Sequence, residues 1–202
     1  AAARGDPLAP YLNPGRQLTL PDIGGSTGVV AHGLSRRFGL RATVIDPAPL
    51  EAQEAQALGL ETIEGLVEEV DLRDRRFDVV IVCQTADHLL DVAGTLHRVR
   101  ALLSDHGILF IDIVDFRAAY LRNWSVEEAI KIDHPYYFTG PAMQAYLRRT
   151  GFEVVRRDYA GDHLHVSYVA RRAEIVADAL PAAADVRDLL REVRFVQNTP
   201  RG

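Results

Sequence analysis

A glycine-rich turn flanked by acids is the part of this sequence best suited to holding a ligand. Its residues are Asp22-Ile23-Gly24-Gly25-Ser26-Thr27-Gly28. The next predicted strand ends at Asp46. Glycines let a backbone approach a ligand closely, and an acid at that strand end can accept hydrogen bonds from both ribose hydroxyls. The glycine order differs from the G-x-G-x-x-G that seats a pyrophosphate, and an acid two residues before the first glycine suits a cationic amino acid. The pattern predicts a site for a nucleoside ligand with a cationic group.

Strands and helices alternate along most of the chain, and this order must position the glycine turn. We expect strands at 17–23, 41–46, 61–64, 77–83 and 108–114, with helices at 27–38, 50–58, 91–103 and 141–150. Two later strands, 152–159 and 164–171, are separated by a short Gly-Asp turn and should form an antiparallel hairpin. The alternation predicts an α/β fold built on an open, doubly wound sheet.

Four segments, in order and in register, resemble the class I S-adenosylmethionine (SAM) methyltransferases. They are the glycine turn, residues 77–91, residues 102–111, and residues 134–139 together with 147–154. The resemblance covers about residues 17–171. It implies a Rossmann-like, doubly wound seven-stranded sheet, mostly parallel, with a C-terminal antiparallel hairpin. Two positions depart from the family: Ser26 replaces a glycine, and Pro21 lies in a central strand, where it cannot donate to the ladder.

The resemblance assigns cofactor-binding roles to residues at the predicted strand ends. It implies that Asp46 binds the ribose of SAM. It implies that Asp22, Gly24, Gly25, Ser26 and Gly28 hold the amino-acid part, that Leu66 and Val67 line the adenine, and that Gln84 and Thr85 lie beside the methyl sulfonium. Each role has a structural alternative: a plain tight turn, a helix cap at Asp46, core packing of the apolar pair, and hydrogen bonds to the loop backbone for Gln84 and Thr85.

The candidate catalytic residues are two histidines that follow predicted strands. His88 or His134 could accept a proton from the methyl acceptor, since histidine titrates near neutral pH. The alternative for His88 is to cap the following helix and pack under the cofactor. Aromatic residues Tyr136, Tyr137 and Phe138 could bind a ring-shaped or carbonyl-bearing acceptor, or could form a hydrophobic plug. Tyr11 could close over the cofactor, with an unordered arm as the alternative.

The composition indicates which binding partners and which cellular location to expect. The 202 residues are 48% hydrophobic, which suits one sizeable domain, and the net charge of −5 argues against nucleic-acid binding. The single cysteine and seven histidines show no zinc-finger spacing, and His163 and His165 lack an evident third ligand, so no metal site is predicted. There is no signal peptide and no membrane-spanning run, so we expect a cytoplasmic protein.

The chain divides by its patterns into an N-terminal arm (1–16), a SAM-binding domain (17–172) and a helical tail (173–202). In the tail, apolar residues recur at helical spacing: Val186, Leu189, Leu190, Val193 and Val196. This stripe should be buried against the domain or a partner, so a homodimer or a partner domain is a further expectation. The first residue is Ala rather than Met, which is consistent with a segment cut from a longer polypeptide.

The sequence therefore predicts a SAM-dependent methyltransferase that acts on a small molecule, for example a natural product or secondary metabolite. The alternative is a catalytically inactive binding module of the same fold within a larger assembly, which Ser26 and Pro21 keep open. A nucleotide-dependent oxidoreductase is a third hypothesis, and the glycine order disfavours it.

Overall fold

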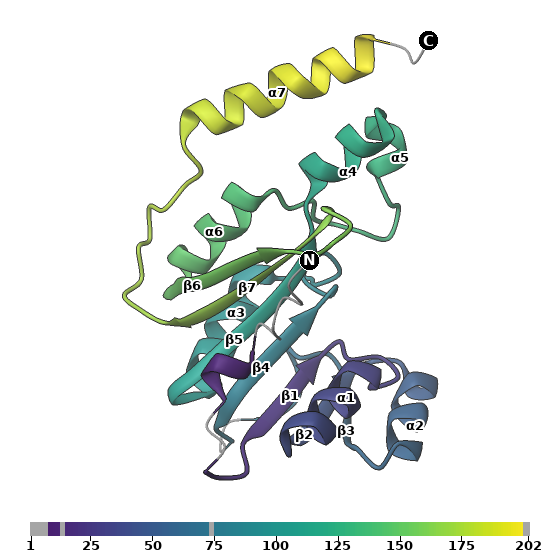
Figure 1. Ribbon diagram of the computed structural model, residues 1–202, viewed down its shortest axis with the longest axis vertical. Helices are drawn as coiled ribbons and strands as arrows, with labels where there is room; N and C mark the ends of the chain where they lie inside the picture. Colours follow the sequence, from purple (N-terminus) through teal and green to yellow (C-terminus); the bar gives the residue numbers. More distant parts are fainter. Residues whose placement is uncertain (1–7, 13–14, 73–74, 200–202) are drawn as a thin grey trace.

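The central feature of the fold is one seven-stranded sheet. A computed structural model describes residues 8–12, 15–72 and 75–199. The strands are β1 (Thr19–Ile23), β2 (Arg41–Asp46), β3 (Glu61–Glu64), β4 (Phe77–Cys83), β5 (Leu103–Val114), β6 (Phe152–Tyr159) and β7 (His165–Arg172). Their order is β3-β2-β1-β4-β5-β7-β6, and only β7 runs antiparallel to its neighbours (Figure 1). The predicted Rossmann-like sheet with its terminal hairpin is confirmed.

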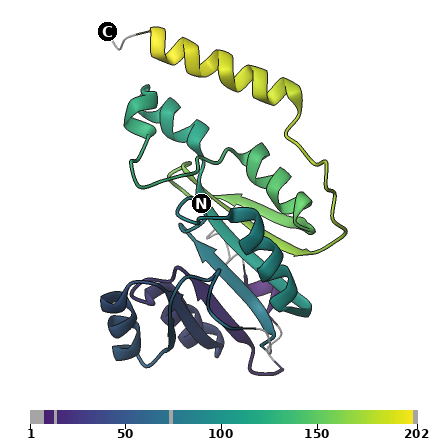
Figure 2. The ribbon, with the colours of Figure 1, turned by 180° about the vertical axis from the view of Figure 1, so that it is seen from behind.

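Helices cover both faces of the sheet. They are α1 (Val29–Phe38), α2 (Pro49–Ala57), α3 (Val92–Leu102), α4 (Phe116–Asn123), α5 (Val126–Ala129), α6 (Gly140–Arg149) and α7 (Ala183–Asn198), with a short 3-10 helix, η1 (Ala9–Tyr11). Helices α1 and α2 pack into one hydrophobic cluster, and α3 and α6 into the other. Figures 1 and 2 show the two sides of this arrangement. Within the described residues, no helix has the length and apolar character needed to cross a bilayer.

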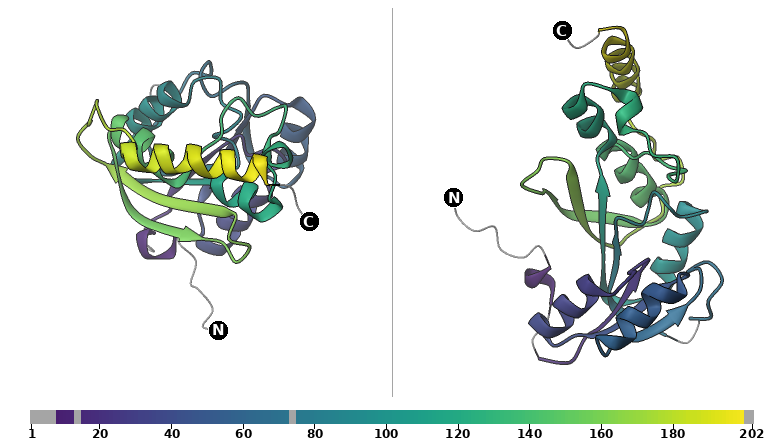
Figure 3. Two further views of the ribbon diagram at one scale, coloured as in Figure 1. Left: turned by 90° about the horizontal axis from the view of Figure 1, so that it is seen from above. Right: turned by 90° about the vertical axis from the view of Figure 1, so that its right-hand side faces the viewer.

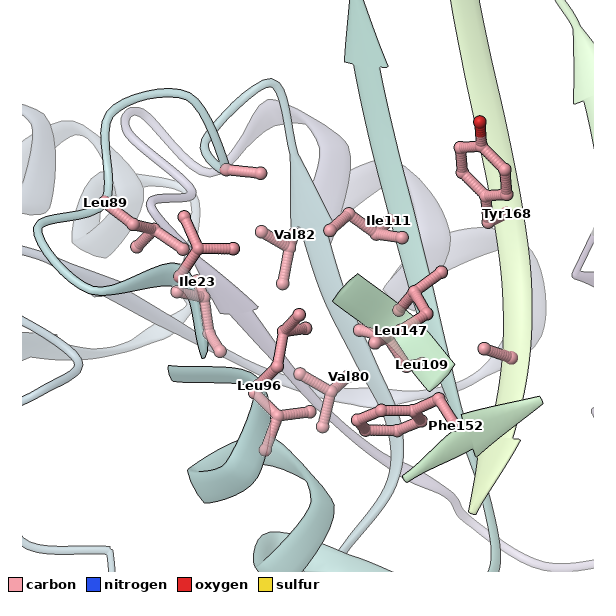
Figure 4. Packing of buried hydrophobic residues seen from close by; sticks show 14 of the residues in the cluster. Ile23, Val80, Val82, Leu89, Leu96, Leu109, Ile111, Leu147, Phe152 and Tyr168 are labelled. Carbon is pink, nitrogen blue, oxygen red and sulfur yellow. The ribbon is translucent and has the colours of Figure 1, made fainter. Parts of the chain in front are cut away.

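The core explains why the middle strands consist of apolar runs. Val80 and Val82 of β4 point to the α3 and α6 face, where Leu96 and Leu147 cover them (Figure 4). Val79 and Ile81, the alternate residues of β4, point to the other face and pack with α1 and α2. A central parallel strand buried on both sides therefore needs an apolar residue at every position.

Pro21 interrupts one ladder without displacing its strand. β1 pairs with β2 over five residue pairs, but with β4 only through Asp22 and Ile81. The Gly24 N–H donates to Ile45 of β2, and successive residues alternate in direction, so the nitrogen of Pro21 faces β4. Because proline has no N–H, the β1–β4 ladder is short at this point.

Two helices between β5 and α6 were not predicted. The chain leaves β5 and forms α4, whose N-cap Asp115 accepts a hydrogen bond from the Arg117 N–H. It then forms α5, capped by Ser125. In addition, β5 begins at Leu103 rather than at Ile108, because an irregularity in its pairing with β4 accommodates the intervening residues. The segment from α4 to α6 forms the roof of the site described below.

The prediction for the tail is correct for the helix and wrong for part of its stripe. In α7, Val196 is buried, and Leu189 and Val193 pack against α4 and α5. Val186 and Leu190 are 42% and 54% exposed and are not part of the cluster that α7 forms with α4 and α5. Figure 3 shows α7 at the end of the molecule opposite to α1 and α2.

Candidate functional site

The glycine turn connects β1 to α1 and is hydrogen-bonded to the end of β2. Gly24 and Ser26 adopt positive φ angles of 65° and 48°, so Ser26 takes a conformation that normally favours glycine. The Ser26 N–H donates to Asp46 Oδ2 at 2.8 Å, which ties the turn to the end of β2. A Cβ at Gly24 would lie only 2.3 Å from the Thr85 side chain, so the turn also packs closely against the loop after β4.

Asp22 lies beneath this turn rather than in open space. It is 1% exposed, the Ala31 N–H acts on it as a weak donor that lowers its pKa, and neither carboxylate oxygen makes a hydrogen bond of normal geometry with the described residues. Burial raises the pKa of Asp22 to about 7, and repulsion by the Asp46 carboxylate acts in the same direction. A hydrogen-bond donor or a cation close to this carboxyl would therefore stabilise its charged form.

A cavity of about 310 Å³ opens at the carboxyl ends of β1, β2 and β4. Its walls are Ile23, Gly24, Ile45, Asp46, Pro47, Gly65, Leu66, Val67, Glu68, Gln84, Thr85, His88, Leu89 and Leu90. Most of the predicted cofactor residues are thus brought together. Asp22, Gly25, Ser26 and Gly28 do not line the cavity; they shape the turn behind it.

Asp46 reaches the cavity but is already hydrogen-bonded to the backbone. Its Oδ2 accepts from Ser26, and its Oδ1 accepts from the Ala48 N–H at 2.9 Å. Each carboxylate oxygen retains a second lone pair, so these bonds orient Asp46 while leaving it able to accept from a ligand hydroxyl.

Gln84 and Thr85 both bond to nearby protein groups as they leave β4. Gln84 has a φ of 53°, and its Nε2 donates to Asp112 Oδ2 at 2.7 Å. Thr85 Oγ1 donates to the Cys83 carbonyl at 2.9 Å. The structural alternative, a hydrogen bond to the loop backbone, is therefore present for Thr85, whereas Gln84 bonds to a side-chain carboxylate; both residues also line the cavity.

A second cavity, of about 200 Å³, lies under the segment between β5 and α6. Its walls are Asp87, Ile113, Val114, Phe116, Ala119, Asn123, Glu128, Ala129, Lys131, His134, Tyr136, Tyr137, Phe138 and Leu164. All three predicted acceptor aromatics line it. Phe138 is also a buried core residue that stacks on Tyr136 with ring centroids 5.8 Å apart, so it supports the wall from behind.

Two histidines in contact with each other belong to the walls of the two cavities. His88 lines the first cavity and His134 the second, and their rings make an edge-on contact with centroids 4.5 Å apart. The Tyr136 hydroxyl donates to the Leu90 carbonyl at 3.1 Å, which links the two walls again. His88 is not the cap of α3, because Asp91 accepts the hydrogen bond from the Gly94 N–H.

Asp87 is the site residue that sequence reasoning missed. It is 8% exposed, and its Oδ2 lies 3.0 Å from His134 Nδ1. Asp87, His88 and His134 each offer a possible metal ligand within 4.8 Å of one another, a clustering that the sequence did not reveal. The pair is an ion-pair contact, and a proton on Nδ1 is favoured because lone pairs on the two atoms would repel each other at that distance. The adjacent Asp87-His88 in the sequence was the available signal.

Tyr11 does not reach either cavity. Its ring lies 5.5 Å from the Arg171 guanidinium, and Arg171 pairs with Ile108 in the first half of β5, away from the strand ends that form the site. Tyr11 packs on the α1 face of the sheet. The prediction that it closes over the cofactor is therefore wrong for this structure, because η1 places it at the other end of the strands.

Comparison with known proteins identifies the family. A family model described as a methyltransferase domain matches residues 3–157. This chain belongs to that methyltransferase-domain family. The class I SAM-dependent methyltransferase predicted from the sequence is confirmed at the level of the family, and an oxidoreductase is excluded at that level.

Curated relatives of this methyltransferase-domain chain share a name. The ubiquinone biosynthesis O-methyltransferase of Methylobacterium sp. (strain 4-46) is 32% identical over 111 residues, covering 52% of this chain and 43% of the relative. The protein of the same name from Azorhizobium caulinodans is 25% identical over 159 residues, covering 71% and 62%. The chain thus spans less than two thirds of the length of these relatives.

Solved methyltransferase structures share the fold of this chain. A SAM-dependent methyltransferase from Clostridium acetobutylicum has a TM-score of 0.64 at 12% identity, covering 77% of this chain and 84% of that one. The 1,6-didemethyltoxoflavin-N1-methyltransferase of Burkholderia thailandensis, solved with S-adenosylhomocysteine, has a TM-score of 0.62 at 22% identity, covering 79% and 73%. At these identities the likeness establishes the architecture.

A larger cavity of about 620 Å³ lies beside α7, away from the glycine turn of the methyltransferase domain. Its wall includes Arg117, Asp115, Tyr159 and Glu192, which are already bonded: Arg117 pairs with Glu192, and the Tyr159 hydroxyl donates to Asp115 at 2.6 Å. No predicted site residue lines it, so size alone does not identify the functional site.

Proposed function

We propose that this chain transfers a methyl group from SAM to a hydroxyl of a small, ring-shaped acceptor. One observation carries the proposal: a nucleoside-sized cavity and an aromatic-lined cavity meet at His88 and His134. The name shared by the curated relatives, an O-methyltransferase of ubiquinone biosynthesis, supports a hydroxyl acceptor.

The residues of the first cavity fit SAM. Leu66, Val67 and Leu89 offer flat apolar surface for an adenine, and Asp46 offers carboxylate oxygens for ribose hydroxyls. The buried carboxyl of Asp22, directly under the turn, favours a cation nearby. When bound, SAM supplies a methyl group already activated by a positive sulfonium.

The residues of the second cavity would then position the acceptor. Tyr136, Tyr137 and Phe116 provide aromatic surface, and His134 provides a nitrogen that can take a proton. Holding two reactants in line is itself worth several orders of magnitude in rate, and a general base adds about 10²–10⁴-fold. Residues of α4, α5 and the following loop form one wall of this cavity.

A catalytically inactive binding module is the second candidate. It is favoured by the replacement of a glycine by Ser26, which occupies a positive φ, and by the internal hydrogen bonds of Gln84 and Thr85. Such a module would hold the nucleoside without turning over an acceptor.

Calorimetry and an activity assay separate these functions. We expect S-adenosylhomocysteine and SAM to bind, NAD to give no heat, and catechol or a related phenol to be methylated. Binding without turnover over a panel of phenols would support the inactive module. Absence of binding by folded protein would contradict both.

A further inference from the structure

We infer that Asp87 is a positioning residue for His134, that His134 rather than His88 is the base, and that His88 serves the cofactor side. This inference rests on the proposed function. The sequence left either His88 or His134 as the base, and the inference gives the two histidines different roles. The division follows from which cavity each ring lines and from the carboxylate that only one of them contacts.

The contact with Asp87 selects one tautomer of His134. Asp87 Oδ2 lies 3.0 Å from Nδ1, and a carboxylate oxygen offers only lone pairs, so the tautomer with the proton on Nδ1 avoids a repulsive contact and is favoured. In the neutral ring the lone pair is then on Nε2. His134 is half-buried in the wall of the aromatic cavity, so this nitrogen is the one available to an acceptor hydroxyl.

Asp87 has no other function in the part of the chain that the structure describes. It does not cap α3, since Asp91 does so, and its Oδ1 is buried without a hydrogen-bond partner. A buried carboxylate with one unsatisfied oxygen is costly, and such costs concentrate at functional sites. The orientation of His134 is the one effect of Asp87 that the contacts support.

The other charged groups around His134 do not duplicate Asp87. Asp133 Oδ1 is 4.0 Å from Nε2, too far for a hydrogen bond, and its side chain is 68% exposed. Glu128 and Lys131 line the same cavity, the His88 ring packs edge-on at 4.5 Å, and the Tyr137 ring centroid is 6.3 Å away. Among the described residues, only Asp87 has a carboxylate oxygen within about 3 Å of a ring nitrogen of His134.

The proposed step transfers one proton from the acceptor hydroxyl to His134 Nε2. The acceptor O–H bond breaks, its electron pair stays on oxygen, and a new N–H bond forms at His134 Nε2. The ring becomes an imidazolium whose other proton is already held by the Asp87 carboxylate. The imidazolium then returns the Nε2 proton to solvent. The nucleophilic oxygen is thereby produced in the cavity, next to His134.

The test begins with the tautomer of His134, which needs neither SAM nor turnover. Histidine ¹⁵N–¹H correlation spectra of the whole protein, assigned with His134→Gln, should show His134 in the Nδ1–H form. Asp87→Asn should shift it toward the Nε2–H form, since the amide can donate to Nδ1. Asp133→Asn is the matched control, because it removes a neighbouring carboxylate that makes no hydrogen bond to the ring, and it should leave the tautomer unchanged.

Kinetics complete the test. With catechol as acceptor, Asp87→Asn should lower kcat on the order of 10²-fold while the affinity for S-adenosylhomocysteine stays within about twofold. Asp133→Asn should keep normal turnover. His88→Ala should instead weaken S-adenosylhomocysteine binding. If Asp87→Asn fails to fold, the spectrum of the unsubstituted protein still decides the tautomer.

Three results would overturn the inference. One is an Nε2–H tautomer in the unsubstituted protein. Another is unchanged kcat in Asp87→Asn. The third is a shift of the His134 resonances on adding Mg²⁺ or Zn²⁺, with activity lost in a chelator, which would make the cluster a metal site. Failure of S-adenosylhomocysteine to bind would contradict the proposed function and leave the tautomer result standing.

Discussion

Buried Asp22 is the residue with the strongest consequence for stability. Its pKa of about 7 in the folded protein is well above the ordinary value of 3.8 for an aspartate, and burial is the main cause. The folded state therefore binds the proton more tightly than the unfolded chain does. Its contribution to the free energy of unfolding is fully present below about pH 4 and is lost as pH rises through 7.

Replacing Asp22 by Asn should remove this pH dependence. We expect the difference in unfolding free energy between pH 5 and pH 8 to shrink by about 2–3 kcal/mol, since the two pH units between pH 5 and the folded pKa of about 7 contribute about 1.4 kcal/mol each. Urea unfolding at both pH values measures it. Asp105→Asn, at an exposed carboxylate, is the control. An equal pH dependence in Asp22→Asn would mean that another group titrates.

Asp46 should matter for the ligand and for the turn together. Asp46→Ala removes the acceptor of the Ser26 N–H and, by our proposal, that of the ribose. We expect S-adenosylhomocysteine affinity to fall by about 1–3 kcal/mol, the scale of hydrogen bonds to a charged group. Calorimetry measures this. Unchanged affinity would show that the carboxylate only holds the turn.

At the scale of elements, an arginine in α3 holds the wall of the cofactor cavity. Arg98 Nη1 donates to the Glu68 carbonyl at 3.0 Å, and Nη2 donates to the Val70 carbonyl. The segment they fix, between β3 and β4, carries Leu66 and Val67. A helix on one face of the sheet thus positions a loop at its edge.

Arg98→Met should loosen that wall. We predict that S-adenosylhomocysteine affinity falls by about 1–2 kcal/mol, because two bonds from a charged donor are lost. Arg100→Met is a matched control in the same helix, since Arg100 bonds the carbonyls of Gly151 and Ala173 instead. Arg100→Met should lower the melting temperature without affecting affinity. Equal effects of the two variants on affinity would refute a local role for Arg98.

At the scale of the whole molecule, α7 is joined to the domain through α4 and α5. Glu192 bonds Arg117 at 2.7 Å and accepts from the Tyr120 hydroxyl at 2.7 Å, while the Trp124 indole donates to the Thr199 carbonyl. These contacts lie apart from both cavities that form the candidate site. The helix therefore supports the roof of the site from outside.

Deleting residues 183–202 should destabilise the protein without abolishing cofactor binding. The deletion exposes apolar surface of Tyr120 and Val126, now packed against Val196. We expect a loss of about 1–3 kcal/mol in unfolding free energy and nearly unchanged S-adenosylhomocysteine affinity. Calorimetry and urea unfolding of the truncated chain test both. Loss of affinity with full stability would link α7 to the site directly.

Local patterns determined the sheet and one half of the site. Apolar runs such as Phe77–Cys83 predicted buried strands, and Asp22, the glycine turn and Asp46 predicted the nucleoside end, because these features depend on neighbours in the sequence. The helices α4 and α5 were missed although Asp115 and Ser125 are ordinary N-caps. They are only eight and four residues long, too short to show a helical period, and tertiary packing stabilises them.

Only the tertiary structure shows which of the candidate catalytic residues contact each other. Asp87 and His134 are separated by a strand and three helices, so only the folded chain shows that their side chains are 3.0 Å apart. It likewise moved Tyr11 away from the site and left Val186 exposed. Contacts between side chains at the end of a sheet depend on how the loops after different strands are arranged in space. The periodicity of each segment does not predict that arrangement.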